Sequence, residues 1–244
     1  MSGTLLRQFS ANGHGRDFAV GDIHGHFSAL RTGLAAIGFD ASRDRLFAVG
    51  DLVDRGPESA QVADWLDKPW FHAVRGNHEA MACAAIGGGD EPVRFHRDNG
   101  GAWLHRISPA EQARIGQALL NLPLAIEIET ARGPVGLIHA DLPTDDWQDV
   151  RRGEFSPRQA AYCIWSVDRY RRGYTSKVRN IRAVVHGHMI VPRMEILGNA
   201  YFIDTNGGSE GGYFTFLDLG TLKASCGPGG EARAARRLRR AKQT

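Results

Sequence analysis

Five short apolar stretches of this 244-residue chain each end in a turn that carries Asp, Asn or His. Their length and apolar content predict strands at residues 18–20, 46–49, 71–74, 135–138 and 183–185. Helical patterns lie between the early strands, and such alternation predicts an α/β core. Because ligands in such folds bind beyond the carboxyl ends of the strands, the polar turns are candidates for one shared site.

Helix-start signals and apolar spacing predict the remaining elements. Helices are expected around residues 27–37 and 62–66, and Ser-Pro pairs predict two more helices beginning at 108 and 156. Residues 201–203 and 212–219 are expected to be strands, paired as a hairpin across the Gly-rich turn at 207–212. The segments Gly-Gly-Gly at 87–89 and Asn-Gly-Gly at 99–101 indicate a mobile excursion between the third strand and the helix at 108.

The net charge of +3 is unevenly distributed along the chain. Residues 231–244 hold six Arg or Lys and one Glu, which leaves 24 basic and 26 acidic groups in the other 230 residues. The basicity therefore belongs to a tail, and the overall charge does not identify a nucleic-acid binder. This helix-compatible tail is a candidate for weak contact with nucleic acid, a membrane or another acidic surface, and a solvated end is the alternative.

Length and composition favour one catalytic domain at 16–220, between a flexible N-terminus (1–15) and a basic C-terminal tail (221–244). No apolar run approaches the ~18 residues of a membrane span. The first ten residues lack the pattern of a signal peptide. The three cysteines are far apart, which excludes a thiolate metal motif and fits a reducing, cytoplasmic setting.

The turns after the strands combine carboxylates, imidazoles, an amide and two arginines. They carry Asp22, His24, Asp51, Asp54, Arg55, Arg75, Asn77, His78, Glu79, His139, His186 and His188. Such nitrogen and oxygen ligands suit Mn, Fe or Zn. A site for two metal ions needs a shared ligand, and the carboxylate of Asp51 is the natural bridge.

Arg55 and Arg75 flank these ligands, and paired guanidinium groups beside metal ions indicate a phosphate substrate. The combination predicts hydrolysis of a phosphoric ester, with hydroxide supplied by the metal ions and a histidine that protonates the leaving oxygen. No P-loop or nucleophile elbow is present in the sequence. The histidines outside these turns (14, 72, 96 and 105) are expected to be structural or surface groups.

Three motifs follow one another at intervals of about 20–25 residues: Asp22-x-His24-Gly, Gly50-Asp-x-x-Asp-Arg-Gly56 and Gly76-Asn-His-Glu79. In this order they resemble the phosphoprotein phosphatase family of calcineurin-like metallophosphoesterases, and in particular the bacterial and phage lambda-type serine/threonine protein phosphatases. Asn99-Gly-Gly, His139-Ala-Asp141 and Gly187-His188 extend the resemblance over roughly residues 15–220. The resemblance implies a four-layer α/β/β/α sandwich in a single domain.

The resemblance also implies a role for each matching residue. One ion would be held by Asp22, His24 and Asp51, and the other by Asp51, Asn77, His139 and His188. A metal-bridging hydroxide would attack phosphorus in line, His78 would act as general acid oriented by Asp54, and Arg55 and Arg75 would bind the phosphoryl oxygens. Mn²⁺ is the usual activator of bacterial relatives.

Two departures from the family pattern concern the edge of the site. The phage enzyme has a phosphate-binding Arg where this chain has Val167, and Arg169 is the nearby substitute. His186 precedes the expected ligand His188 by two residues, which makes it a candidate for support behind the ligands.

The expected function is a serine/threonine phosphoprotein phosphatase, acting on a phosphorylated protein or a small phosphoester. A symmetrical dinucleoside tetraphosphate hydrolase is the alternative, since that family is closely related. Those enzymes often have Asp in place of Glu79 and tend to be longer in the cap region. A non-catalytic binding module is the third possibility, and the complete ligand set argues against it.

Overall fold

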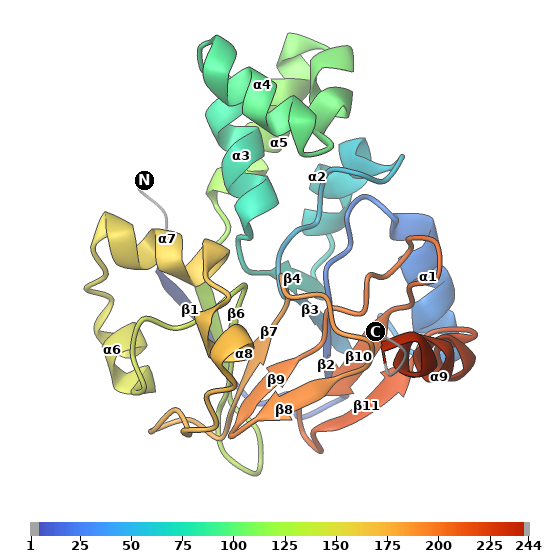
Figure 1. The fold of residues 1–244 in the computed structure, drawn as a ribbon, viewed down its shortest axis with the longest axis vertical. Coiled ribbons are helices and arrows are strands. Elements are labelled where there is room, and N and C mark those ends of the chain that lie inside the picture. Colours follow the sequence, from blue (N-terminus) through green and yellow to red (C-terminus); the bar gives the residue numbers. More distant parts are fainter. Residues whose placement is uncertain (1–4, 242–244) are drawn as a thin grey trace.

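The computed structural model describes residues 5–241, which form two β-sheets with helices on their outer sides (Figure 1). The six-stranded sheet has the order β1 (Leu6–Phe9), β5 (Ala125–Ile128), β6 (Val135–Ile138), β7 (Ala183–His186), β9 (Ala200–Phe202) and β8 (Glu195–Leu197). The five-stranded sheet has the order β11 (Lys223–Cys226), β10 (Thr215–Asp218), β2 (Asp17–Val20), β3 (Arg45–Ala48) and β4 (Phe71–Ala73). All five strands predicted ahead of polar turns are present.

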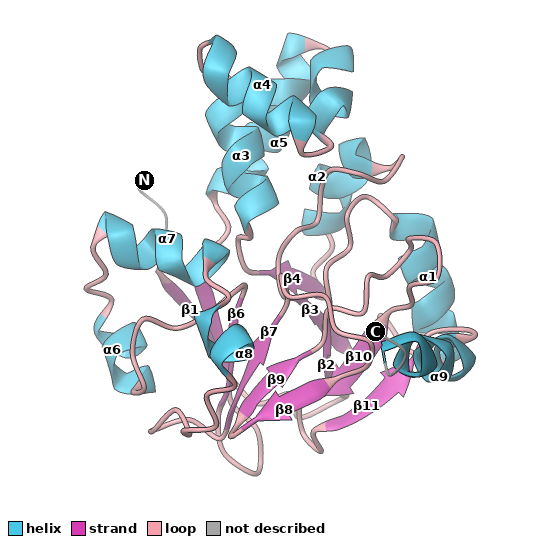
Figure 2. Ribbon diagram, viewed as in Figure 1, coloured by secondary structure: helices cyan, strands magenta, loops and turns pink. Residues whose placement is uncertain are grey.

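Alternate residues of the central strands face two different cores, one on each side of the sheet. Figure 2 shows the helices on the outer sides of the two sheets. Ala19 and Phe47 of the five-stranded sheet pack in one cluster with Val185 of the six-stranded sheet. Their neighbours Phe18 and Leu46 face the opposite way, toward the helices of their own side. The central strands are therefore apolar on both faces, and the sandwich has the four layers α/β/β/α that the sequence predicts.

The helices divide between the two sheets. Beside the five-stranded sheet lie α1 (Phe27–Ala36), α2 (Val62–Leu66), α3 (Asn77–Ala85), α5 (Pro109–Leu120) and the short 3₁₀ helix η1 (Ser59–Gln61). Beyond α3 lie α4 (Asp90–Asp98) and the 3₁₀ helix η2 (Gly101–Arg106). Beside the six-stranded sheet lie α6 (Trp147–Arg152), α7 (Pro157–Trp165) and α8 (Asp168–Arg172). The two Ser-Pro signals are confirmed, since Ser108 and Ser156 each accept a hydrogen bond from the third backbone N–H of their helix.

The predicted hairpin across the Gly-rich turn is wrong. Strand β9 pairs with β7 and β8, whereas β10 pairs with β2 and β11 in the other sheet. The turn at 207–212 therefore crosses from one sheet to the other. Glycines and apolar alternation identify a turn and two strands, but the partner of each strand depends on contacts far away in the sequence. The excursion expected at 87–101 likewise contains a helix, α4.

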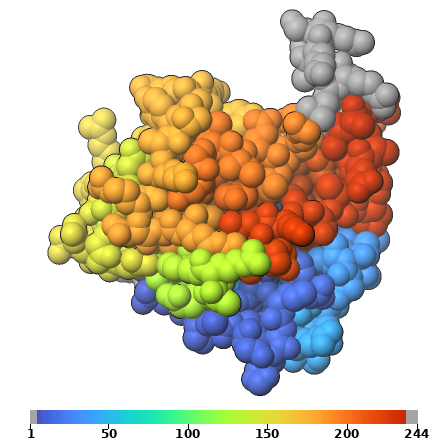
Figure 3. All heavy atoms as spheres, turned by 90° about the horizontal axis from the view of Figure 1, so that it is seen from below, coloured from blue at the N-terminus to red at the C-terminus, as the bar shows by residue number. Residues whose placement is uncertain are grey.

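Ordered structure extends beyond both limits of the predicted domain. Strand β1 pairs in parallel with β5 although it lies before residue 16, and β11 pairs with β10 although it lies after residue 220. Helix α9 (Gly230–Ala241) follows, and its Arg233 donates a hydrogen bond to the carbonyl of Gly212. Figure 3 shows this C-terminal segment in red at the molecular surface. Among the described helices, none has the length and apolar character that crossing a membrane requires.

Candidate active site at the strand ends

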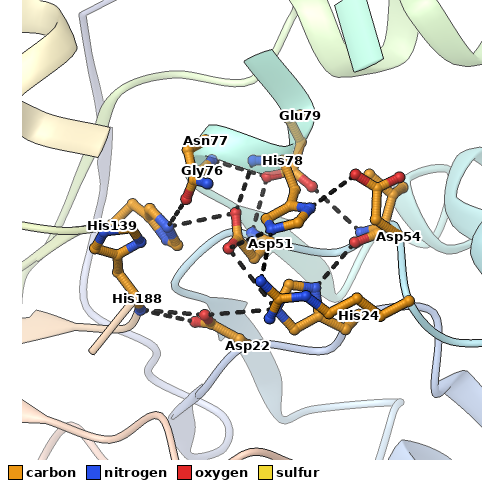
Figure 4. A network of polar contacts seen from close by, with 12 residues as sticks. Asp22, His24, Asp51, Asp54, Gly76, Asn77, His78, Glu79, His139 and His188 are labelled. Atoms are coloured by element: carbon orange, nitrogen blue, oxygen red, sulfur yellow. Dashed lines mark hydrogen bonds and ion pairs between the residues drawn. The ribbon is translucent and has the colours of Figure 1, made fainter. Parts of the chain in front are cut away.

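The turns after β2, β3, β4, β6 and β7 converge at one edge of the two sheets (Figure 4). They bring together Asp22, His24, Asp51, Asp54, Arg55, Asn77, His78, His139 and His188. The structure contains two sets of potential metal ligands, and within each set the ligand atoms lie within 4.8 Å of one another. One set consists of His24, Asp51 and His78, and the other of Asp51, His139 and His188. Asp51 belongs to both sets, which is the arrangement expected of a shared ligand.

The backbone of these turns adopts an unusual conformation. Positive φ angles occur at His24 (46°), Asp51 (50°), Asp54 (72°), Arg55 (67°) and His188 (61°). Residues other than glycine adopt this region at a cost, and such strain concentrates at functional sites. Glu79 supports two of the turns, because its buried carboxylate accepts hydrogen bonds from the backbone N–H groups of Asp51, Leu52 and Gly76 at 2.7–2.8 Å.

Hydrogen bonds to backbone carbonyls orient two of the imidazole rings. His139 donates from Nδ1 to the carbonyl of Val49 at 2.7 Å, and His24 donates from Nδ1 to the carbonyl of Val53 at 3.1 Å. In both rings Nε2 is then the atom that faces the cluster, as in most metal-binding histidines. His139 Nε2 lies 2.9 Å from Asn77 Oδ1 and 3.3 Å from Asp51 Oδ1. Burial disfavours the charged ring, but Asp51 outweighs that effect and raises the pKa of His139, so the position between Nε2 and these oxygens favours a cation, either a proton or a metal ion.

The cluster also concentrates buried negative charge. Burial raises the pKa of Asp22, and the neighbouring Asp204 and Asp51 raise it further. Burial likewise raises the pKa of Asp204 to about 6 and that of Glu79 to about 7. Burying several negatively charged carboxylates together costs free energy unless cations compensate their charge. The set of donors therefore fits divalent metal ions. Asp204 was not among the predicted site residues, although it follows strand β9 as the other acids follow their strands.

A second hydrogen-bonded chain begins at Asp54. Its Oδ2 accepts a hydrogen bond from His78 Nδ1 at 2.7 Å. Nε2 of His78 lies 3.0 Å from Arg55, whose other terminal nitrogen lies 2.7 Å from His24 Nε2. The guanidinium group of Arg55 therefore bridges two imidazole rings at the edge of the cluster.

Two further donors to Asp54 were not predicted from the sequence. His96 Nε2 and Trp103 Nε1 both donate to Asp54 Oδ1, at 2.9 and 2.7 Å. Burial raises the pKa of Asp54, but the hydrogen bonds from His78 and His96 outweigh that effect and hold it below its ordinary value. His96 is buried within α4, which agrees with a structural rather than a surface group, and its contact with Asp54 links it to the site.

Arg75 and Arg169, the other two arginines that the sequence assigns to phosphate, form their hydrogen bonds with groups outside the cluster. Arg75 donates to the carbonyls of Leu120 and Leu122 at 2.5 and 3.0 Å, where it satisfies the C-terminal end of α5. Arg169 is paired with Asp145 at 2.6 Å and donates to backbone carbonyls of the following loop. Sequence patterns locate a guanidinium group but not its direction.

The two histidines at the end of β7 differ in their surroundings. His188 donates its backbone N–H to Asp22, and its Nε2 lies 3.2 Å from the carbonyl of Trp165. His186 is buried and stacks on Phe202, with ring centres 5.0 Å apart. Burial lowers the pKa of His186 to about 3, so the ring is neutral in the folded protein.

The geometry agrees with the proteins that this chain is similar to. The chain is 31% identical over 220 residues to serine/threonine-protein phosphatase 2 of Escherichia coli (strain K12), a match that covers 86% of this chain and 96% of the relative. It is 34% identical over 209 residues to serine/threonine-protein phosphatase 1 of Salmonella typhimurium (strain LT2), covering 83% and 91%. A symmetrical bis(5'-nucleosyl)-tetraphosphatase of Methylococcus capsulatus (strain Bath) is 32% identical over 165 residues, covering 62% and 58%.

Solved structures share the same fold at lower identity. The crystal structure of a candidate diadenosine tetraphosphatase superimposes with a TM-score of 0.61 at 21% identity, covering 91% of this chain and 97% of that one. Residues 18–200, which include each of the converging turns, match the calcineurin-like phosphoesterase family. With a match over this length and relatives above 30% identity along most of the chain, the protein belongs to the calcineurin-like phosphoesterase family.

Proposed function

We propose that this protein hydrolyses phosphomonoesters with two divalent metal ions and that its substrates are phosphoserine and phosphothreonine proteins. The observation that carries the proposal is the position of Asp51 in both ligand sets, beside the pair formed by Asp54 and His78. The relatives named serine/threonine-protein phosphatases match more than four-fifths of the chain and support the substrate class.

The two proposed metal sites share Asp51. Asp22, whose carboxylate lies 4.0 Å from His24 Nε2, completes one site with His24, and Asn77, His139 and His188 complete the other. His78 lies within reach of the first site but is assigned to proton transfer, and buried His186 supports the ligands from behind. When bound, two such ions supply a hydroxide nucleophile and neutralise the charge of the phosphoryl group. We propose Mn²⁺ as the resident ion, while Fe and Zn also suit these nitrogen and oxygen donors. Metal analysis of the purified protein and reconstitution of the metal-free protein with each ion test this assignment.

The proposed roles of the other residues follow from their hydrogen bonds. Asp54 takes the Nδ1–H of His78, and Nε2 accepts a hydrogen bond from Arg55 in this structure. Nε2 is therefore the atom that would carry a proton to the leaving oxygen once Arg55 contacts the phosphoryl group instead. Arg55 offers two parallel donors to the phosphoryl oxygens, and its guanidinium group already lies within 3.0 Å of His78 Nε2. A phosphoryl group held by Arg55 therefore places its ester oxygen next to the acid. Arg75 and Arg169 are weaker candidates for contact with phosphate, because their terminal nitrogens donate to backbone carbonyls or pair with Asp145 outside the cluster.

The main alternative is a symmetrical dinucleoside tetraphosphate hydrolase. The similarity to the Methylococcus capsulatus relative covers a smaller share of both chains than that to the protein phosphatases, which favours the protein phosphatase. The decisive experiment compares kcat/KM for phosphoserine, phosphothreonine and phosphotyrosine peptides with that for diadenosine tetraphosphate. A preference of about 100-fold for the dinucleotide, which corresponds to about 2.7 kcal/mol, would overturn the choice. No turnover of any phosphoester with Mn²⁺ would leave only a binding module.

Two further proposals concern the surroundings of the enzyme. The tail at 231–244 carries six of the basic residues, and we propose that it binds nucleic acid or another acidic surface. Equal binding of RNA and of anionic vesicles by the full chain and by a variant without these residues would refute this role. The free thiols of Cys83, Cys163 and Cys226 support a reducing compartment such as the cytoplasm.

A further inference from the structure

Helix α4 and η2 bring two side chains to a carboxylate more than forty positions away in the sequence. His96 is fully buried, and its Nε2 lies 2.9 Å from Asp54 Oδ1. Trp103 Nε1 lies 2.7 Å from the same oxygen. The other oxygen, Oδ2, accepts the hydrogen bond from His78. The carboxylate of Asp54 therefore lies between the proposed general acid on one side and two donors on the other.

Two consecutive glycines allow this close approach. A Cβ atom at Gly101 would lie 2.2 Å from the ring of His96, so any larger residue would displace the imidazole. Gly100 has a φ of 99°, and its carbonyl accepts the backbone N–H of Arg55 at 3.2 Å. A Cβ atom there would lie 2.8 Å from that same N–H. The segment from α4 to η2 is thus shaped to pack against the turn that carries Asp54 and Arg55.

The donors fix the orientation of the carboxylate. A carboxylate can rotate about its bond to Cβ, and a single hydrogen bond to His78 would leave that rotation weakly restrained. Two N–H groups on Oδ1 define the plane of the group, and Oδ2 then points at His78 Nδ1. Because Asp54 is buried, loss of a donor also leaves an acceptor without compensation for its lost hydration.

We propose that His96 and Trp103 are positioning residues that hold Asp54 in the orientation in which it fixes the imidazole ring of His78. Hydrogen bonds connect them to Asp54, and through it to His78, whereas neither belongs to the two ligand sets of the cluster. The inference rests on the proposed role of His78 as general acid. It assigns a function to the segment from α4 to η2, which carries none of the proposed metal ligands.

A series of leaving groups tests this role. His96→Phe removes the donor and keeps a planar ring, whereas His96→Gln keeps an N–H that can reach Asp54. With phenyl phosphate, whose poor leaving group needs a proton, we expect His96→Phe to lower kcat about 10–100-fold, a part of the ~10²–10⁴ that a positioned acid contributes. With 2,4-dinitrophenyl phosphate, whose leaving group needs no proton, we expect less than about a threefold loss. His96→Gln should recover most of the activity on phenyl phosphate.

The controls separate positioning from general damage. His105→Ala changes an exposed neighbour of His96 on η2 and should leave both substrates unaffected. Trp103→Phe should show the same dependence on the leaving group as His96→Phe, but more weakly. Histidine ¹⁵N NMR of the metal-free protein should show that His78 loses its fixed Nδ1–H tautomer in His96→Phe, independently of any activity.

The possible outcomes are distinct. Equal losses on both substrates, no loss on either, or an unchanged His78 tautomer in His96→Phe would overturn the inference. If His96→Phe does not fold, Trp103→Phe carries the same comparison of substrates and of NMR signals. A wild-type protein that hydrolyses neither substrate with Mn²⁺ would instead overturn the proposed function, which the tautomer measurement does not depend on.

Discussion

Asp51 and Asp54 are the same residue type, three positions apart on one turn and both buried, yet their surroundings are opposite. The side chain of Asp51 lies among imidazoles, with His139 Nε2 at 3.3 Å and His24 Nε2 at 3.8 Å. Asp54 accepts N–H groups from His78, His96 and Trp103. Asp51 accepts one backbone N–H, from His78, and otherwise lies beside imidazole rings that can act as ligands, while Asp54 accepts side-chain N–H groups on both of its oxygens.

This difference decides what each carboxylate can do. The lone pairs of Asp54 are taken by donors, so the group cannot also bind a metal ion and serves to orient a ring. Asp51 is surrounded by atoms that are themselves potential ligands, so a cation is the partner that stabilises the group. The surroundings of a carboxylate, more than its burial, separate metal binding from positioning at this site.

The largest effect is expected at Asp51. Asp51→Asn keeps the shape of the side chain but removes the charge shared between the two proposed ions, so turnover of p-nitrophenyl phosphate with Mn²⁺ should fall by at least about 10³-fold. Bound metal, measured by elemental analysis, should fall as well. Full metal content with near-normal turnover would show that Asp51 does not bridge the ions.

The next effect is expected along the chain from Asp54 to His78. His78→Asn and Asp54→Asn should each lower turnover of phenyl phosphate about 10²–10⁴-fold and leave the metal content near normal. Because both residues serve one proton transfer, the double variant should be hardly worse than His78→Asn alone. Additive losses would mean that Asp54 acts independently of His78, and metal loss in either variant would place it with Asp51 instead.

Only part of the contrast between Asp51 and Asp54 could be predicted from the sequence. The convergence of the proposed ligands was predictable, because each of them follows an apolar strand and parallel strands end at the same edge. The donors to Asp54 were not, because His96 and Trp103 lie 42 and 49 positions away and reach it through the packing of α4 and η2. Near His96 and Trp103, the sequence feature that points to a close contact is the pair of glycines at 100 and 101. Such glycines indicate that another segment approaches closely, but they do not identify that segment.

Local sequence does not show tertiary contacts, and this limit also explains the wrong strand partners and the unpredicted hydrogen bonds of Arg75. The strands 201–203 and 212–219 were correctly located from their apolar pattern, but their partners lie in different sheets. Arg75 precedes the motif that carries Asn77 and His78, yet its side chain turns toward the end of α5. Local sequence determines which segment forms an element, whereas strand partners and the directions of long side chains are set by tertiary contacts.

The arginines give a third, smaller effect. Arg55→Ala should raise KM for a phosphopeptide about tenfold or more, because a charge-assisted contact to phosphate contributes about 1.5–3 kcal/mol. Arg75→Ala should leave KM unchanged and lower the thermal unfolding temperature, since it removes donors to the carbonyls of Leu120 and Leu122. A rise in KM for Arg75→Ala that matches that of Arg55→Ala would restore both arginines to the phosphate site.

The smallest effect is expected at Ser59, which supports the backbone of Asp54. Its hydroxyl group is buried and accepts the N–H of Asp54 at 2.9 Å, at a residue whose φ is 72°. Ser59→Ala should lower the free energy of unfolding by about 1 kcal/mol, as expected for one buried hydrogen bond. Metal content should not change, because the backbone at Asp51 is held separately by Glu79. If metal binding weakened along with stability in urea titrations, the two halves of the turn would act as one unit, and the distinction between Asp51 and Asp54 would lie in their side chains alone.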